Sequence, residues 1–502
     1  MNCNLEVPIF DFQRFLRFSS ELGSLKTIDL SFTFTEPESE ENNFELLITQ
    51  SIQRKLVARK KRVCKLLFNV KDGDPLNFKI LKNFFHLALL RNVQFSISVS
   101  EEETLQILRR YLESIDQRKP WIFLKSLLFC LELDFCEKDQ DILNEKAKVW
   151  SQELQSLTQI KTDVAPDFKL HFDFLQKPRR ELVSHFTKAL ENSTNLKSIG
   201  IQRNASEDCA GLLENNHALE AINIGGDIVS EPLVNSLTNL TSLKELAFSL
   251  PDATKFDPEN LNVFAEKLQN LSQLTHLTLN CKQSNSCEDE FYVNLAESLK
   301  QYSELKYLSL VFSAKDQGSL SHISNSSISD ILKSLKGLKT LHSLEITFEK
   351  YQELIQNKQL ECFSESINTL PDLKNLEMTF IGDQINDKGI SGFIKVLADL
   401  KQLETLTIRF PHTTLSKEVF LEFIRALEGL QLLSKLNIVF GCNEIDENVI
   451  EAVRKMIYSL KCLDMLYMWI KVKEGKVFNK MSVLRLNQEF QQRMVASIRI
   501  SK

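Results

Sequence analysis

The sequence predicts an α/β solenoid, a stack of about fifteen short parallel strands that are each backed by a helix. Two observations predict this fold. A pattern of apolar residues recurs about every thirty residues along most of the 502-residue chain. Within each interval, the spacing changes from the two-residue alternation of a strand to the three- or four-residue spacing of a helix. A chain of this length would otherwise be expected to form several globular domains.

The clearest copies of the repeat lie in the C-terminal half. Four segments, LKNLEMTF, LETLTIRF, LSKLNIVF and LDMLYMWI, begin 30 residues apart at Leu373, Leu403, Leu433 and Leu463. The same frame continues upstream at Leu341, Leu305, Leu274, Leu243, Leu219 and Leu196. Fainter copies begin at Leu124, Val63 and Leu25, with degenerate rows near Leu90 and Asp167. We therefore expect one repeat array over residues 1–470, degenerate over 1–190 and regular over 191–470.

Each row predicts a strand with one buried face. Its apolar residues occupy positions 1, 4, 6 and 8, and the alternation at the last three is typical of such a strand. Position 8 is often phenylalanine, as in Phe32, Phe312, Phe348, Phe380, Phe410 and Phe440. An aromatic stripe can line a ligand pocket, but at an inward position core packing explains it better. We expect a spine of stacked rings.

The segments between rows predict helices. Phe420, Phe423 and Leu427 follow the spacing of a helix with one buried face. Pro258 fits the first helical position, and Ser416 and Asp446 are well placed as N-caps. The serine-rich stretch 319–329 lies in the longest interval of the regular rows, of 36 residues, and we interpret it as an inserted loop.

These LxxLxLxF rows, together with helices such as KGISGFIKVLADL, resemble the ribonuclease-inhibitor-like class of leucine-rich repeats. The resemblance covers about residues 190–470. The residue pattern of the repeats looks like that of the large leucine-rich-repeat families of ciliated protists. It implies a horseshoe-shaped solenoid with its parallel sheet on the concave face. One departure stands out: the family's rows usually end in Asn or Cys, and here phenylalanine takes that place.

Composition narrows the classes of partner. The net charge of −6 makes nucleic acid an unfavoured partner, because phosphate contacts require basic surfaces. No uncharged apolar run is long enough to span a bilayer, and the N-terminus lacks the pattern of a signal peptide. The ten cysteines are scattered without a CxxC pair, as in reduced cytoplasmic proteins. We expect a cytoplasmic protein that binds another protein.

The concave face supplies the candidate binding residues. If positions 4, 6 and 8 point inward, positions 3, 5 and 7 lie on that face. Its residues are mixed in charge and rich in small polar side chains. From them we select as candidate partner-binding residues Tyr307, Glu345, Glu377, Arg409, Lys435, Met465, Tyr467 and Trp469.

The last full row allows two interpretations. Met465, Tyr467 and Trp469 would all point from the concave face, and exposed aromatic residues are typical of interface hot spots. A terminal repeat must also hide its apolar edge, so the following segment could fold over them as a cap. We assign residues 471–502, which carry eight basic and two acidic residues, as a C-terminal basic cap.

The sequence contains no recognisable catalytic or cofactor-binding motif. Phosphate-binding glycine loops, HExxH and nucleophile-elbow patterns are absent, and the eight histidines are dispersed. His171 beside Asp173 is the single histidine–carboxylate pairing expected on the concave face, and no nucleophile accompanies it. We therefore predict no enzyme activity, cofactor or metal.

Three functions remain open at this point. The leading hypothesis is a non-enzymatic scaffold or adaptor that holds a protein on the concave face. The resemblance also implies a regulator of an enzyme, because the family includes inhibitors and GTPase-activating proteins. A third possibility is a structural subunit of a large assembly such as a ciliary or ubiquitin-ligase complex.

Overall fold

The computed structural model describes most of the chain from residue 126 onward and short segments before it. The described residues are 29–33, 65–70, 92–99, 102–115, 126–135, 139–160, 167–174, 178–191, 193–202, 207–225, 230–250, 258–282, 287–313, 323–349, 351, 354–381, 384–442, 445–472, 488 and 495–501. The chain divides into two compact units, Met1–Gly226 and Asp227–Lys502. In the described residues, no helix combines the length and apolar character that crossing a bilayer would require.

The N-terminal unit alternates strands and helices. Its strands are β1 (Asp29–Thr33), β2 (Lys65–Val70), β3 (Asn92–Val99), β4 (Ser126–Phe135), β5 (Asp167–Phe174), β6 (Leu196–Gln202) and β7 (Ala221–Gly225). Its helices are α4 (Glu102–Ile115), α5 (Gln140–Thr158), α6 (Arg180–Leu190) and α7 (Gly211–Glu214), with a 3₁₀ turn at Glu207–Ala210. Each strand pairs in parallel with the next one in the sequence.

The C-terminal unit continues the same alternation. Its strands are β8 (Glu245–Leu250), β9 (His276–Lys282), β10 (Tyr307–Ser313), β11 (Ser343–Glu349), β12 (Asn375–Phe380), β13 (Thr405–Leu415), β14 (Lys435–Cys442), β15 (Met465–Val472) and β16 (Val495–Ser501). Its helices are α8 (Glu231–Thr238), α9 (Pro258–Lys267), α10 (Asp289–Leu299), α11 (Asn325–Ser334), α12 (Asn357–Ile367), α13 (Asp387–Leu397), α14 (Lys417–Glu428) and α15 (Glu447–Ser459). Short 3₁₀ turns follow α9 at Leu268–Asn270 and α11 at Leu335–Gly337.

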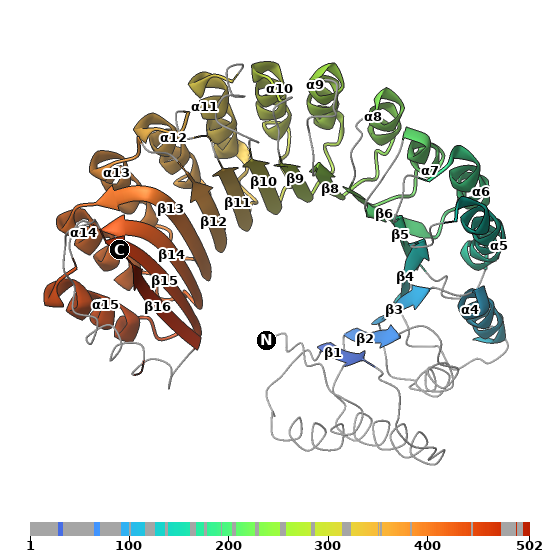
Figure 1. The fold of residues 1–502 in the computed structure, drawn as a ribbon, viewed down its shortest axis with the longest axis horizontal. Coiled ribbons are helices and arrows are strands. Elements are labelled where there is room, and N and C mark those ends of the chain that lie inside the picture. The colour runs from blue at the N-terminus through green and yellow to red at the C-terminus, as the bar shows by residue number, and fades with distance from the viewer. Residues whose placement is uncertain are drawn as a thin grey trace, which may run out of the picture. The chain divides into compact units, whose positions relative to one another are not determined.

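The strands confirm the predicted solenoid. β1 to β15 fall in the fifteen predicted rows, and β8 to β16 pair in parallel in sequence order. The leucines stay in register from strand to strand, so Leu344 pairs with Leu376 and Leu376 with Leu406. In Figure 1 the helices of the C-terminal unit cover one side of its sheet. We call the opposite side, on which the described residues place no helix, the helix-free face.

Phenylalanine rings form the predicted spine in the C-terminal unit. Phe312, Phe348, Phe380, Phe410 and Phe440 lie on five successive strands and are at most 2% exposed. The ring centroids of successive members are 5.4 to 6.5 Å apart. Such contacts add to the stabilisation from apolar burial. The stripe therefore belongs to the core, while the side chain of Phe32 lies outside the described residues.

The predicted helix starts are also confirmed. Pro258 is the first residue of α9. The Ser416 hydroxyl accepts a hydrogen bond from the Val419 backbone N–H, and the Asp446 carboxylate accepts one from the Val449 N–H. Each cap satisfies an N–H group that the helix itself cannot pair.

Polar links join the N-terminal ends of neighbouring helices from α10 to α15. A side chain in the first turn of one helix bonds to the cap or first turn of the adjacent helix. The linked pairs are Asp289 with Ser324, Asn325 with Gln359, Asn357 with Asn386, Asp387 with Ser416 and Lys417 with Asp446. This ladder and the phenylalanine spine together tie successive repeats to each other.

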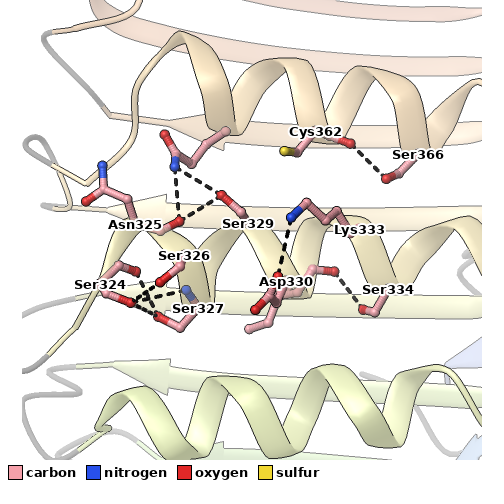
Figure 2. Close-up of polar contacts among 12 residues, drawn as sticks. Ser324, Asn325, Ser326, Ser327, Ser329, Asp330, Lys333, Ser334, Cys362 and Ser366 are labelled. Carbon is pink, nitrogen blue, oxygen red and sulfur yellow. Dashed lines mark hydrogen bonds and ion pairs between the residues drawn. The ribbon is translucent and has the colours of Figure 1, made fainter.

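The serine-rich segment corrects one prediction. We expected 319–329 to be an inserted loop, but helix α11 begins at Asn325 and includes its last five residues. Figure 2 shows why serines are accepted there: the Ser324 hydroxyl caps the helix, and Ser329 bonds back to the Asn325 carbonyl. Gln359 of α12 donates to both Ser329 and Asn325. The serines supply the contact between two helices.

The end of the chain adds a strand to the sheet. β16 pairs in parallel with β15, with Met465 opposite Val495 and Trp469 opposite Arg499. This strand lies beyond the last predicted row. A separate cap over 471–502 stays a prediction, because the structure describes only residues 471, 472, 488 and 495–501 of that range.

Candidate functional site

The helix-free face of the C-terminal unit is organised in three rows that cross the strands. Residues in a row are Cα partners on adjacent strands, about 4.8 Å apart. The first row contains Glu245, His276, Tyr307, Ser343, Asn375, Thr405, Lys435 and Met465. The middle row contains Ala247, Thr278, Ser309, Glu345, Glu377, Thr407, Asn437 and Tyr467. The third row contains Ser249, Asn280, Val311, Thr347, Thr379, Arg409, Val439 and Trp469.

The eight candidate residues fall into two groups on this face. We call Tyr307, Glu345, Glu377 and Arg409, on strands β10 to β13, the acidic group. We call Met465, Tyr467 and Trp469, all on β15, the apolar group. Lys435 lies beside the apolar group, because it is the Cα partner of Met465. A partner role for these residues remains a proposal.

Two carboxylates stand side by side in the acidic group. Glu345 and Glu377 are partners in register on β11 and β12. The Ser309 hydroxyl donates a hydrogen bond of 2.7 Å to Glu345 Oε2. Arg409 Nη2 lies 4.0 Å from Glu377 Oε1. At that distance the pair is a loose surface contact, in which solvent screens most of the attraction.

Within the acidic group, the surroundings of Glu377 and Tyr307 disfavour ionisation of their side chains. Burial raises the pKa of Glu377, the charge of Glu345 raises it further, and Arg409 opposes both. Burial likewise raises the pKa of the Tyr307 hydroxyl, with the charge of Glu345 as the next cause. Two negative charges are therefore held together against their mutual repulsion, which is more typical of functional surfaces than of structural ones.

Two neutral polar residues continue the middle row next to Glu377. Thr407 is 8% exposed, and its hydroxyl makes no hydrogen bond among the described residues. Asn437, the next residue in the row, has a buried Oδ1 atom that also lacks a hydrogen-bond partner there. The sequence placed both on this face but gave no sign of their unmet hydrogen-bonding capacity. Buried atoms without a hydrogen-bond partner, such as Asn437 Oδ1, are rare in folded proteins.

The apolar group is open to solvent. Met465 is 45% exposed and Trp469 is 41% exposed. Six large hydrophobic side chains are exposed among the described residues, and these two are the ones that lie on a strand. β16 pairs along the edge of β15 and leaves both side chains accessible.

The N-terminal unit presents a different environment at His171. We expected Asp173 to be its carboxylate neighbour, but the Cα partners of His171 are Glu132 on β4 and Gly200 on β6. Burial lowers the pKa of His171, and Glu132 partly offsets this. A Cβ at position 200 would lie 2.1 Å from His171 Nδ1, so glycine makes room for the ring. This arrangement packs a histidine and supplies no nucleophile.

The described residues contain no group of three side chains that could hold a metal ion. Nor do they bring the dispersed histidines together, since His276 stacks on Tyr307 at 5.9 Å and contacts its neighbour Thr275. The chemistry on the helix-free face is thus that of hydrogen bonding, charge and apolar contact.

Comparisons with known proteins did not assign the chain to a family. No family model matches the chain, and no curated protein matches it. Among solved structures, one similar chain is "Leiomodin-1 Actin-Binding Site 2 (ABS2)", at 16% sequence identity and a TM-score of 0.19. The match covers 46% of this chain and 94% of that one. The assignment of the fold rests on the register of the strands themselves.

Proposed function

We propose that this chain is a non-enzymatic scaffold or adaptor that binds a protein on the helix-free face of its C-terminal unit. The observation that carries the proposal is the exposure of Met465 and Trp469 on a strand. Solvent-exposed side chains of this size on one strand present apolar surface to water. A partner that covers this surface gains binding free energy. Tryptophan is enriched among residues that dominate binding energy.

The composition of the face supports a protein as the ligand. The acidic group, on β10 to β13, and the apolar group, on β15, are separated by strand β14, which carries Lys435. Protein interfaces combine an apolar centre with polar and charged surroundings in this way. A phosphate backbone would require a basic track, and Glu345 and Glu377 oppose one.

A photo-cross-linking experiment tests the proposal. p-Benzoylphenylalanine replaces Thr405 in the first row, and in a second variant it replaces the exposed Glu418 on helix α14 of the same repeat. We expect the probe at 405 to cross-link one protein in native cells and the probe at 418 to miss it.

Competition provides the specificity control. Excess untagged wild-type chain should abolish the cross-link at 405, while a chain carrying Met465→Ala and Trp469→Ala should compete at least about tenfold less well. The proposal fails if both probe positions cross-link the same proteins, or if the double variant competes as well as the wild type.

A further inference from the structure

The acidic group has more hydrogen-bond acceptors than the described residues satisfy. A carboxylate can accept about four hydrogen bonds. Glu345 accepts one from Ser309, and Glu377 has only the loose contact with Arg409. The two charges of Glu345 and Glu377 face a single positive charge. The group is therefore short of both donors and positive charge.

Thr407 and Asn437, which follow Glu377 in the middle row, also lack hydrogen-bond donors in the part of the chain that the structure describes. Thr407 is more than nine-tenths buried, and its hydroxyl has no partner among the described residues. Asn437 Oδ1 is buried and equally unpartnered. These two observations are independent of the charges, because both residues are neutral. Both continue the row of the carboxylates: Thr407 is the Cα partner of Glu377, and Asn437 is the Cα partner of Thr407.

The chemistry of a matching ligand follows from this set. An anion would meet the repulsion of two carboxylates, and a carbonyl group would bring further acceptors. A side chain that carries several N–H donors and a positive charge satisfies the two adjacent carboxylates. A guanidinium is suited best, because its donors point along different edges and reach two carboxylates at once.

We propose that Glu345 and Glu377 bind a cationic side chain of the protein partner, with Thr407 and Asn437 as neutral acceptors beside them. The proposal rests on the proposed function, because it assumes that a protein occupies this face. Tyr307 lies in the first row on the strand next to Glu345, with its ring stacked on His276. Arg409 is the resident cation that the partner's side chain displaces from Glu377.

Peptide binding to the full chain tests the site. The probe is a fluorescein-labelled peptide of alternating arginine and serine, and its control carries citrulline, a neutral group of the same shape, in place of arginine. Fluorescence anisotropy at low ionic strength measures affinity. We expect the arginine peptide to bind the wild type and the double variant Glu345→Gln, Glu377→Gln to bind it at least about tenfold more weakly.

Glu361→Gln provides a control for the loss of a negative charge outside the helix-free face. Glu361 is an exposed residue on helix α12, and its variant removes one negative charge away from the face. We expect its affinity to stay within about twofold of the wild type. The proposal is overturned if the citrulline peptide binds equally well, if Glu361→Gln weakens binding as much as the double variant, or if the double variant binds like the wild type.

Removing the resident cation gives a second, opposite readout. Arg409→Ala should strengthen binding of the arginine peptide by about threefold, because it ends the competition for Glu377. A loss of binding in this variant contradicts the site. A gain cannot come from a folding defect, so the two variants together separate binding from stability.

The cross-linking experiment separates this inference from the proposed function. If the Glu345→Gln, Glu377→Gln chain competes for the cross-linked protein as well as the wild type, the cation site is refuted and the scaffold stands. If the peptide results are as expected but the probe at 405 captures no competed protein, the scaffold is refuted while the cation site stands.

Discussion

Strands β10 to β14 carry two surfaces that differ in how well their groups are satisfied. On the buried surface, every phenylalanine of the spine is at most 2% exposed and contacts the next ring. On the helix-free face, Glu345 and Glu377 repel each other, and burial disfavours the charge of Glu377. The phenylalanine spine on the buried surface stabilises the fold, whereas the repulsion between Glu345 and Glu377 on the helix-free face opposes it. This contrast is the one expected if the helix-free face has the binding role proposed above.

The largest expected effect comes from removing a ring of the spine. Phe348 is fully buried, with the Phe312, Phe380 and Tyr351 rings 5.4 to 5.8 Å from its own. Phe348→Ala should lower the free energy of unfolding by about 3–5 kcal/mol, because it loses apolar burial and leaves a cavity. Urea denaturation followed by circular dichroism measures this. Trp469→Ala, a comparable truncation on the other surface, should cost less than about 1 kcal/mol, and equal costs would break the comparison.

An intermediate effect is expected at the helix links. A Cβ on Gly389 would lie 2.3 Å from Asn357 Oδ1, the atom that accepts the Asn386 backbone N–H. Gly389→Ala should therefore lower the free energy of unfolding by about 1–2 kcal/mol through loss of that bond.

Gly392 in the same helix is the matched control. A Cβ there meets no atom within 4 Å, so Gly392→Ala should raise the free energy of unfolding by up to about 1 kcal/mol through better helix propensity. Thermal denaturation of both variants compares them directly. If both changes stabilise the protein, the hydrogen bond between Asn386 and Asn357 does not contribute to stability.

The smallest expected effect is a gain in stability at Glu377. Its pKa is raised by burial and by the charge of Glu345, so ionisation costs the folded state free energy. That cost is present at neutral pH and disappears as the pH falls through the raised pKa to the unfolded value. Glu377→Gln should therefore stabilise the chain by a few tenths of a kcal/mol at pH 7, reduced by solvent screening, and by nothing near pH 4.

Paired melting curves at the two pH values, with Glu361→Gln as the control, measure this difference. A destabilised Glu377→Gln protein at pH 7 would mean that the contact with Arg409 outweighs the repulsion, and the contrast between the two surfaces would not hold for this residue.

The sequence predicted the strands well because their signal is local. Burial at alternate positions shows directly in the leucines, and Leu376, Met378 and Phe380 of β12 are all buried as expected. It missed β16, although Ile498 and Ile500 continue the alternation as Cα partners of Met468 and Ile470. The signal was present, but the segment lacks the leading leucine of the frame.

The helix α11 and the acidic group show where sequence reasoning ends. Serines resemble a loop in composition, but Ser329 lies in a helix, and Gln359 of the next repeat donates a hydrogen bond to its hydroxyl. Likewise, the sequence placed Thr407 and Asn437 on the face, but their lack of partners depends on how neighbouring strands position them. Both features depend on residues about thirty positions away.

The ladder of helix links has a consequence for how long such an array can be. Asn357 accepts the N–H of Asn386, and Asp387 accepts that of Ser416, so equivalent oxygen and nitrogen atoms recur in these two successive joints. Excising one whole thirty-residue period would bring Asn357 opposite Ser416 and Phe348 opposite Phe410. The Ser416 N–H would again meet an acceptor, and the Phe348 ring would again meet another ring. The C-terminal unit is thus built to gain or lose complete modules without redesign of the joint.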